Sequence, residues 1–139
     1  MAITEDYVNF ETAKLLKKKG FSENTEHEIW YVIKQFSTGC PWNSCTYKVG
    51  DITREYNDDC CILMPTLQMA MKWLREVHDI YIDISIYVIT KNILKYNIGV
   101  YYKKHKNDSM YLGIHLTKEC SKYEKAVEVA IKYCLENLI

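Results

Sequence analysis

Residues 80–90, "IYIDISIYVIT", alternate between aliphatic positions and others that are mostly more polar, the period of a strand with one buried face. Residues 95–104 and 109–116 show the same period. The positions expected to face a core are Ile80, Ile82, Ile84, Ile86, Val88, Tyr96, Ile98, Val100, Tyr102, Met110, Leu112, Ile114 and Leu116. Because only short connectors separate these segments, they predict a three-stranded antiparallel meander.

The segment before this meander, "PTLQMAMKWLREVHDI", predicts a helix whose polar positions fall on one narrow face. These positions are Gln68, Lys72, Arg75, Glu76 and Asp79. Two pairs, Lys72–Glu76 and Arg75–Asp79, have the i,i+4 spacing of weak ion pairs. The rest of the circumference is apolar or small, so we expect this helix to be buried on most sides and to form the spine of a core.

Two more helices flank these elements in the sequence. The first is predicted over residues 10–19, with Asn9 as the N-cap and Gly20 in the left-handed position just after its end. The last is predicted to open with a capping box formed by Ser121 and Glu124. The stripe expected to pack on the sheet is Tyr123, Ala126, Val127, Ala130, Ile131, Cys134 and Leu138.

Additional strands are predicted between the first two helices. Residues 29–36 are rich in β-branched and aromatic side chains, and shorter strands are expected near residues 45–49 and 59–63. We find no linker or internal repeat, so residues 1–139 are interpreted as a single domain. The predicted fold class is α+β: an antiparallel sheet, made of the meander plus one or more N-terminal strands, with about three helices packed mainly on one face.

The outward face of the meander is the first candidate binding surface. It carries Tyr81, Tyr87, Tyr101, Tyr111 and His115. Tyrosines on a polar sheet face are typical of protein interfaces and can also stack on nucleobases. Two structural interpretations compete with a binding role: cross-strand tyrosine pairs can stabilise a solvated sheet, or residues 29–63 can cover this face.

The predicted hairpin loop that follows the middle strand is the second candidate surface. Lys103, Lys104 and Lys106 lie there beside His105, so positive charge is concentrated at one end of the sheet. Such a cluster can contact an acidic partner, although a solvated hairpin tip is the simpler interpretation.

Composition narrows the classes of function. The formal net charge is zero, whereas dedicated nucleic-acid binders usually carry a basic excess, so a nucleic-acid partner is disfavoured. No window reaches the apolar length of a membrane span, and the polar N-terminus lacks the apolar core of a signal peptide. We therefore expect a cytoplasmic protein that does not contact membranes, with reduced thiols.

The six cysteines offer one weak candidate for a metal site. Cys40, Cys45, Cys60 and Cys61 could together supply four thiolates to zinc, but their spacing is not that of paired zinc knuckles. The histidines match no metal-binding or catalytic motif. No cofactor is expected and an enzyme is disfavoured, although a cysteine–histidine nucleophile pair needs no proximity in sequence and stays open.

Three segments carry a resemblance: "NFETAKLLKKKGF", "PTLQMAMKWLREVHDI" and "YEKAVEVAIKYCLENLI". In matching order they resemble an uncharacterised family of small proteins from phages and mobile elements of gut anaerobes. The resemblance covers about a third of the chain and not residues 22–64. It implies a phage setting, in which case the cytoplasm would be that of the host cell, and an α+β domain. It implies no catalytic residues.

Residues 65–139 have a second resemblance in the order of their predicted elements. Helix–strand–strand–strand–helix is similar to double-stranded-RNA-binding domains, in which lysines at the start of the last helix grip phosphates. Here "SKYEKAV" keeps Lys122 and Lys125 with Glu124 between them, which departs from that pattern.

These observations favour a non-catalytic binding protein that acts on a host component or associates with itself. A second hypothesis is a protein that sequesters a small ligand such as a signal nucleotide. An RNA-binding domain and a cysteine–histidine enzyme are less favoured hypotheses that the residues still allow.

Overall fold

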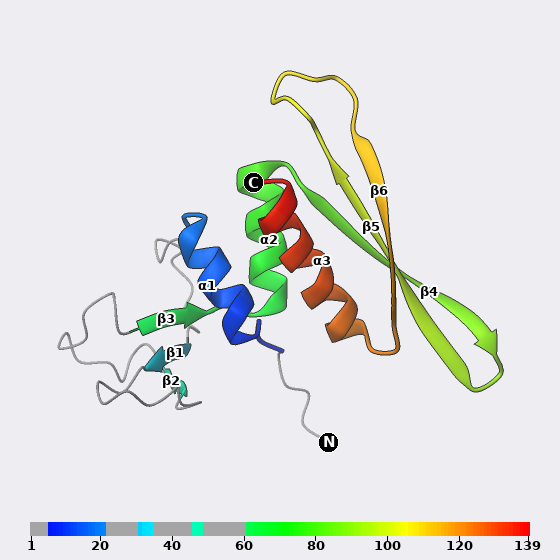
Figure 1. Cartoon of the computed structure of the whole chain (residues 1–139), viewed down its shortest axis with the longest axis horizontal. Helices are drawn as coiled ribbons and strands as arrows, with labels where there is room; N and C mark the ends of the chain where they lie inside the picture. The colour runs from blue at the N-terminus through cyan, green and yellow to red at the C-terminus, as the bar shows by residue number, and fades with distance from the viewer. Residues whose placement is uncertain (1–5, 22–30, 35–45, 49–60) are drawn as a thin grey trace. The chain divides into compact units, whose positions relative to one another are not determined.

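The structure, a computed structural model, describes residues 6–21, 31–34, 46–48 and 61–139. These residues confirm the α+β class, with three helices and two antiparallel sheets (Figure 1). The sequence was interpreted as a single domain. In the structure the chain divides into two compact units, Met1–Thr66 and Leu67–Ile139.

The first unit contains helix α1 (Phe10–Lys18) and strands β1 (Tyr31–Lys34), β2 (Thr46–Lys48) and β3 (Cys61–Met64). The strands form a sheet of their own in the order β2-β1-β3, rather than extending the meander. An antiparallel bridge between Tyr7 and Thr66 ties the segment before α1 to the end of β3.

Both ends of α1 form as the sequence predicts. Asn9 accepts a hydrogen bond from the Thr12 amide at 2.9 Å, which satisfies one of the free donors of the first turn. Gly20 has a φ of +88°, and the Phe21 amide donates back to the Leu16 carbonyl at 3.0 Å. This is the Schellman ending that glycine at this position favours.

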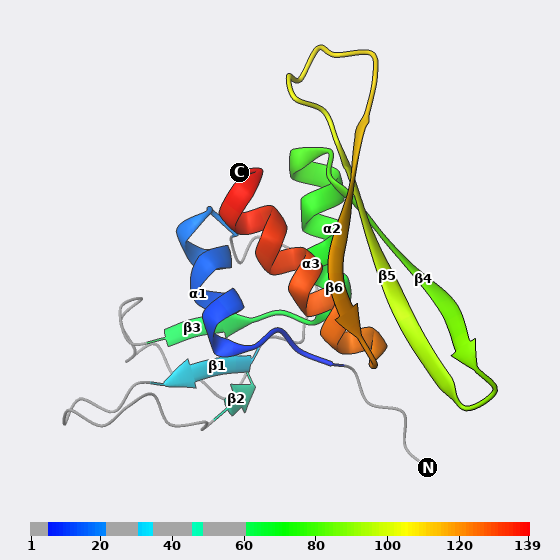
Figure 2. The same cartoon turned by 45° about the vertical axis from the view of Figure 1, so that its right-hand side comes forward.

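The second unit contains helix α2 (Leu67–His78), strands β4 (Tyr81–Thr90), β5 (Ile93–Tyr102) and β6 (Leu112–Cys120), and helix α3 (Tyr123–Asn137). The strands form the predicted meander in the order β4-β5-β6. Both helices pack on one face of this sheet, where Ile98 and Val100 are fully buried (Figures 1 and 2).

Helix α2 is less buried than its composition predicts. Its buried residues are Leu67, Ala70 and Leu74, a stripe at helical spacing, whereas Val77 is 61% exposed. Lys72 and Glu76 do form the expected exposed i,i+4 pair, at 3.8 Å. This stripe packs on α3 and β4, and the rest of the helix is only partly covered.

Helix α3 keeps most of the predicted stripe but not the predicted cap. The buried members are Ala126, Val127, Ala130, Ile131 and Cys134, while Tyr123 is exposed. The N-cap is Lys122, and its side chain makes no capping hydrogen bond, so the predicted capping box is wrong. The helix begins after Lys122, which leaves Ser121 outside the position that could cap it.

The predicted strand pattern fails at both ends of the sheet. At the β4–β5 turn, Ile86 is 60% and Val88 65% exposed, because this end of the hairpin extends past both helices (Figures 1 and 2). The pairing register also shifts between Val88 and Thr90, so the alternation contains a slip. At the opposite end β6 begins at Leu112, which leaves Met110 in the preceding loop and exposed.

We predict that Leu74→Ala destabilises the protein by about 2–5 kcal/mol, because it removes a fully buried side chain and leaves a cavity. Val77→Ala, one helical turn later and mostly exposed, is the matched control and should change stability by less than about 0.5 kcal/mol. Urea denaturation followed by circular dichroism measures both. Similar losses for the two variants would contradict the observed orientation of α2.

Candidate functional site

The outward face of the meander carries the most organised group of exposed aromatic side chains in the described residues. In the register of the sheet, Tyr81 lies opposite Tyr101, and Tyr101 lies opposite Gly113. Tyr111 comes directly before β6. We refer to Tyr81, Tyr101 and Tyr111 as the tyrosine cluster.

Two glycines support the ring of Tyr101. A Cβ atom added at Gly113 would lie 3.0 Å from Cε1 of Tyr101, and one added at Gly99 would lie 3.3 Å from its Cε2. Gly113 is the cross-strand partner of Tyr101, and Gly99 lies two residues before it on the same face. The ring therefore occupies the space that side chains at these two positions would fill, an arrangement that orders an aromatic on a sheet surface.

The other two rings meet edge to face. Tyr81 and Tyr111 have ring centroids 5.5 Å apart and an interplanar angle of 83°. Aromatic pairs prefer this geometry because the positive edge of one ring meets the negative face of the other. Together the three tyrosines line an open, mostly apolar pocket of about 450 Å³.

Asp79 anchors the cluster to the end of α2. The Tyr111 hydroxyl donates to its Oδ1 at 2.6 Å, and the Lys103 ammonium lies 3.2 Å from its Oδ2. The same ammonium lies 4.7 Å above the Tyr111 ring centroid, within cation–π range. One oxygen of the Asp79 carboxylate thus binds the Tyr111 hydroxyl, and the other binds the Lys103 ammonium that lies over the Tyr111 ring.

The backbone of Asp79 explains how its carboxylate reaches this position. Its φ is +57°, the left-handed conformation that aspartate tolerates better than most residues. The residue follows the last turn of α2, and the chain enters β4 at Tyr81 directly afterwards. The predicted Arg75–Asp79 pair is absent from the ion pairs of the described residues, where the carboxylate instead contacts Lys103.

These contacts change the ionisation of both partners. The hydrogen bond from Tyr111, followed by Lys103, lowers the pKa of Asp79, so its carboxylate stays charged to lower pH than usual. The same hydrogen bond raises the pKa of Tyr111 well above the ordinary 10.0, because ionising the phenol would place two negative charges together. The interaction is therefore maintained across the neutral range; it is lost as pH falls through the lowered pKa of Asp79 or rises through the raised pKa of Tyr111.

One predicted site residue, Tyr87, lies apart from the tyrosine cluster. Tyr87 faces Lys95 near the turn end of the hairpin, where Lys95 forms an ion pair with Glu119 that raises the pKa of the lysine and lowers that of the glutamate. His115, by contrast, is exposed and lies opposite Gly99, the glycine beside the Tyr101 ring, so it borders the cluster. The outward face thus has two separate polar groupings, one at each end.

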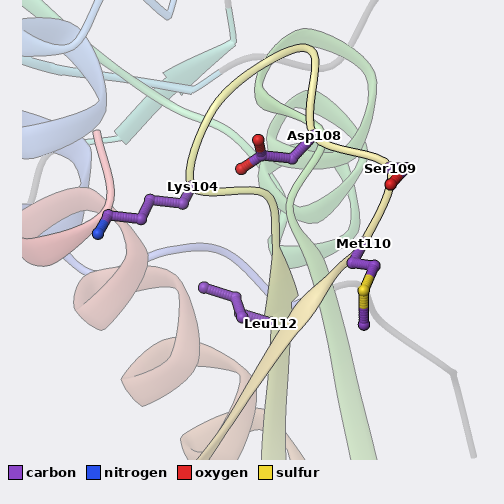
Figure 3. A pocket seen from close by; sticks show the side chains of 5 residues that line it. All are labelled: Lys104, Asp108, Ser109, Met110 and Leu112. Atoms are coloured by element: carbon purple, nitrogen blue, oxygen red, sulfur yellow. The ribbon is translucent and has the colours of Figure 1, made fainter.

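The loop lysines differ in their contacts. Lys103 belongs to the Asp79 contacts, whereas Lys104 and Lys106 are exposed. Lys104 lines a second pocket of about 330 Å³ with Asp108, Ser109, Met110 and Leu112. Figure 3 shows Lys104, Asp108 and Leu112 pointing to one side of the loop and Met110 pointing to the other. Lys104 and Lys106 thus remain exposed in the hairpin loop where the sequence places them, while Lys103 is paired with a carboxylate.

The proposed zinc ligands cannot be placed: Cys40, Cys45 and Cys60 lie outside the described residues, and Cys61 is described through its strand alone. Within the described ranges, no three histidine, cysteine, aspartate or glutamate residues are grouped closely enough to hold a metal. Cys134 is fully buried, and burial raises the pKa of its thiol to about 12, the reverse of an activated nucleophile.

The order α2-β4-β5-β6-α3 agrees with the predicted order of elements in this half of the chain. Lys122 and Lys125 are exposed around the start of α3. Among the residues with an assigned structure, no helix has both the length and the apolar character needed to cross a bilayer.

Comparison of the chain with protein-family models, with curated proteins and with solved structures finds no match.

Sequence reasoning missed two parts of this site. It assigned Asp79 to the solvent strip of α2, and it did not use Gly99 and Gly113 as a platform. The glycines could have been found, since the alternation that places Tyr101 outward also places both glycines on that face. The role of Asp79 depends on a left-handed backbone conformation and on a contact 32 residues away, which no local pattern reveals.

We predict that Asp79→Asn lowers the pKa of Tyr111 toward 10.0, because the phenol then donates to a neutral acceptor. Asparagine also tolerates positive φ, so the backbone should be retained. A pH titration of ¹³Cζ-labelled tyrosines by NMR measures the change, with Tyr133 on α3 as the internal control. An unchanged titration of Tyr111 would show that the Asp79 hydrogen bond does not form in solution.

Proposed function

We propose that this chain is a non-catalytic binding protein of phage or prophage origin that contacts a host protein through the tyrosine cluster. The observation that carries the proposal is an exposed trio of aromatic rings already held in one arrangement. Tyr81 is 40%, Tyr101 37% and Tyr111 42% exposed, yet each ring has a defined neighbour.

Ordering before binding favours affinity. Association must offset the entropy lost when interface side chains become fixed, about 0.5–1.5 kcal/mol for each flexible side chain. Tyr111 is already restrained by Asp79 and Lys103, and Tyr101 by the two glycines beneath its ring. Tyrosine is also enriched among the residues that dominate binding energy at protein interfaces.

The phage setting rests on the resemblance of the three helical segments to small phage proteins. A phage protein made in an infected cell meets the host cytoplasm, so a host protein is the partner we infer. The zero net charge fits a protein partner better than a nucleic acid, whose binding depends on neutralising phosphates.

Sequestration of a small ligand is the second candidate, and the pocket of the tyrosine cluster favours it. Its volume of about 450 Å³ is within the range of small-molecule sites, about 300–1,000 Å³. It is more open than a site that encloses most of a ligand. A weakly held or partly exposed ligand would suit this geometry.

Self-association is the remaining arrangement, and the exposed end of the β4–β5 hairpin favours it. The large apolar side chains exposed there are Ile86, Val88, Ile89, Ile93 and Leu94. An exposed apolar group of this size often marks a contact with another protein.

Native mass spectrometry of gently purified protein separates these candidates. The host-protein proposal predicts a monomer without bound small molecules. A retained small mass would instead support sequestration, and a dimer that dissociates in Val88→Ser would assign the hairpin to self-association.

Binding to the host should depend on Tyr101. We predict that Tyr101→Ser reduces capture of the partner from host lysate by about 30-fold or more, the effect of losing roughly 2 kcal/mol at an interface centre. Tyr123→Ser is the matched control, since Tyr123 has the same exposed fraction, 37%, but lies on α3.

Quantitative proteomics of the captured material, together with thermal unfolding of each variant, measures this effect. Equal capture by both variants would contradict the proposal. A large loss of stability in Tyr101→Ser would instead mean that the cluster serves mainly to hold the sheet together.

A further inference from the structure

The tyrosine cluster already binds one cation, which belongs to the chain itself. The Lys103 ammonium lies over the face of Tyr111 and is paired with Asp79. A positive charge is attracted to the negative face of an aromatic ring, and a nearby carboxylate adds a separate electrostatic attraction to the same charge. The geometry shows that this surface can accommodate a cation between a ring and a carboxylate.

A second carboxylate, that of Asp83, lies beside one of the tyrosines that line the pocket, Tyr101. Asp83 is exposed and lies opposite Gly99 in the register of β4 and β5. An added Cβ at Gly99 would lie 3.7 Å from the Asp83 Cβ and 3.3 Å from Tyr101 Cε2, so Asp83 is beside the edge of the Tyr101 ring. Within the described part of the chain, Asp83 has no ion pair or hydrogen bond of its side chain.

The charges around the pocket leave this carboxylate uncompensated. Asp79 is balanced by Lys103, whereas the cross-strand neighbours of Asp83 and Gly99 add only the imidazole of His115 and no lysine or arginine. An anionic ligand would meet Asp83 without a free cation beside it. A cationic ligand would find a counter-charge and two ring systems, Tyr81 and Tyr101.

We propose that the pocket of the tyrosine cluster receives a cationic side chain of the partner, arginine in preference to lysine, with Asp83 as its counter-charge. This inference rests on the proposed function and names the chemistry of the partner. Arginine is preferred because its planar guanidinium can stack on a tyrosine ring while donating hydrogen bonds to a carboxylate at its edge.

The test uses a cationic and a neutral version of one side chain. N-acetyl-arginine amide and N-acetyl-citrulline amide have nearly the same shape, but only the first is charged. Titrated into the full chain with ¹³C-labelled tyrosines, the arginine compound should shift the Tyr81 and Tyr101 ring signals in a saturable way, with a Kd on the order of 10 mM. The citrulline compound should bind at least threefold more weakly.

Asp83→Asn should reduce the affinity for the arginine compound at least threefold and leave citrulline binding unchanged. Glu124→Gln is the control, because it removes one negative charge from the exposed start of α3, away from the cluster. Equal binding of the two compounds, or an Asp83→Asn variant that binds like the wild type, would overturn the inference. Choline, added as a third probe, should bind no more tightly than the arginine compound.

Tighter binding of choline would overturn the assignment to a partner side chain and would favour a free quaternary ammonium ligand.

The experiments can contradict the inference without contradicting the proposed function, and the reverse. If neither cation binds but capture of the host partner still depends on Tyr101, the interface remains and its cationic chemistry is wrong. If capture does not depend on Tyr101, the interface itself is wrong.

Discussion

The register of β5 against its two neighbours is the constraint on which the site depends. Tyr101 pairs with Tyr81 on β4 and with Gly113 on β6. This pairing places the Tyr101 ring, the glycine that supports it and the neighbouring Tyr81 together on the outward face. The same register buries Ile98 and Val100 under the helices. A slip of one residue would exchange the two faces, which would expose the aliphatic residues and bury the tyrosines.

This register connects stability to function. Burial of the aliphatic face holds β5 in place, and the aromatic face needs no burial of its own to be positioned. Gly99 and Gly113 are unfavourable in a strand interior because they are flexible and offer no side chain to pack. Here the ring of Tyr101 covers both positions. The two glycines that would otherwise weaken the sheet therefore leave the space in which an exposed aromatic side chain is held.

The alternation of apolar and polar residues predicted these strands well wherever the helices pack on the apolar face of the sheet. The meander, the outward position of the tyrosines and both ends of α1 follow from local patterns. The extent of the buried face did not, because alternation cannot tell how far the helices reach along the sheet, and Ile86 and Val88 therefore lie exposed. The width of the buried stripe on α2 was overestimated for a similar reason: the sequence shows which residues are apolar but not how many neighbours surround the helix.

Only part of the site could be predicted, because the alternation of residues identifies the face of a strand but not the distances between residues on that face. Periodicity identifies which tyrosines share a face, but it does not separate Tyr87 from the other three, because that depends on distance along the strands. Nor does it show that Asp79 leaves the helix in a left-handed conformation to meet Tyr111. Contacts between the end of one element and the loop of another are set by the three-dimensional path of the chain.

The central claim is that Tyr101 lies in a fixed position over two glycines in solution. The most direct measurement is the NMR chemical shift of the Gly99 and Gly113 Hα protons, together with their nuclear Overhauser effects to the Tyr101 ring. The structure predicts ring-current upfield shifts for at least one Hα of each glycine, and strong cross-peaks to the ring. Random-coil Hα shifts and no cross-peaks would show that the ring moves freely and that the cluster is not organised before binding.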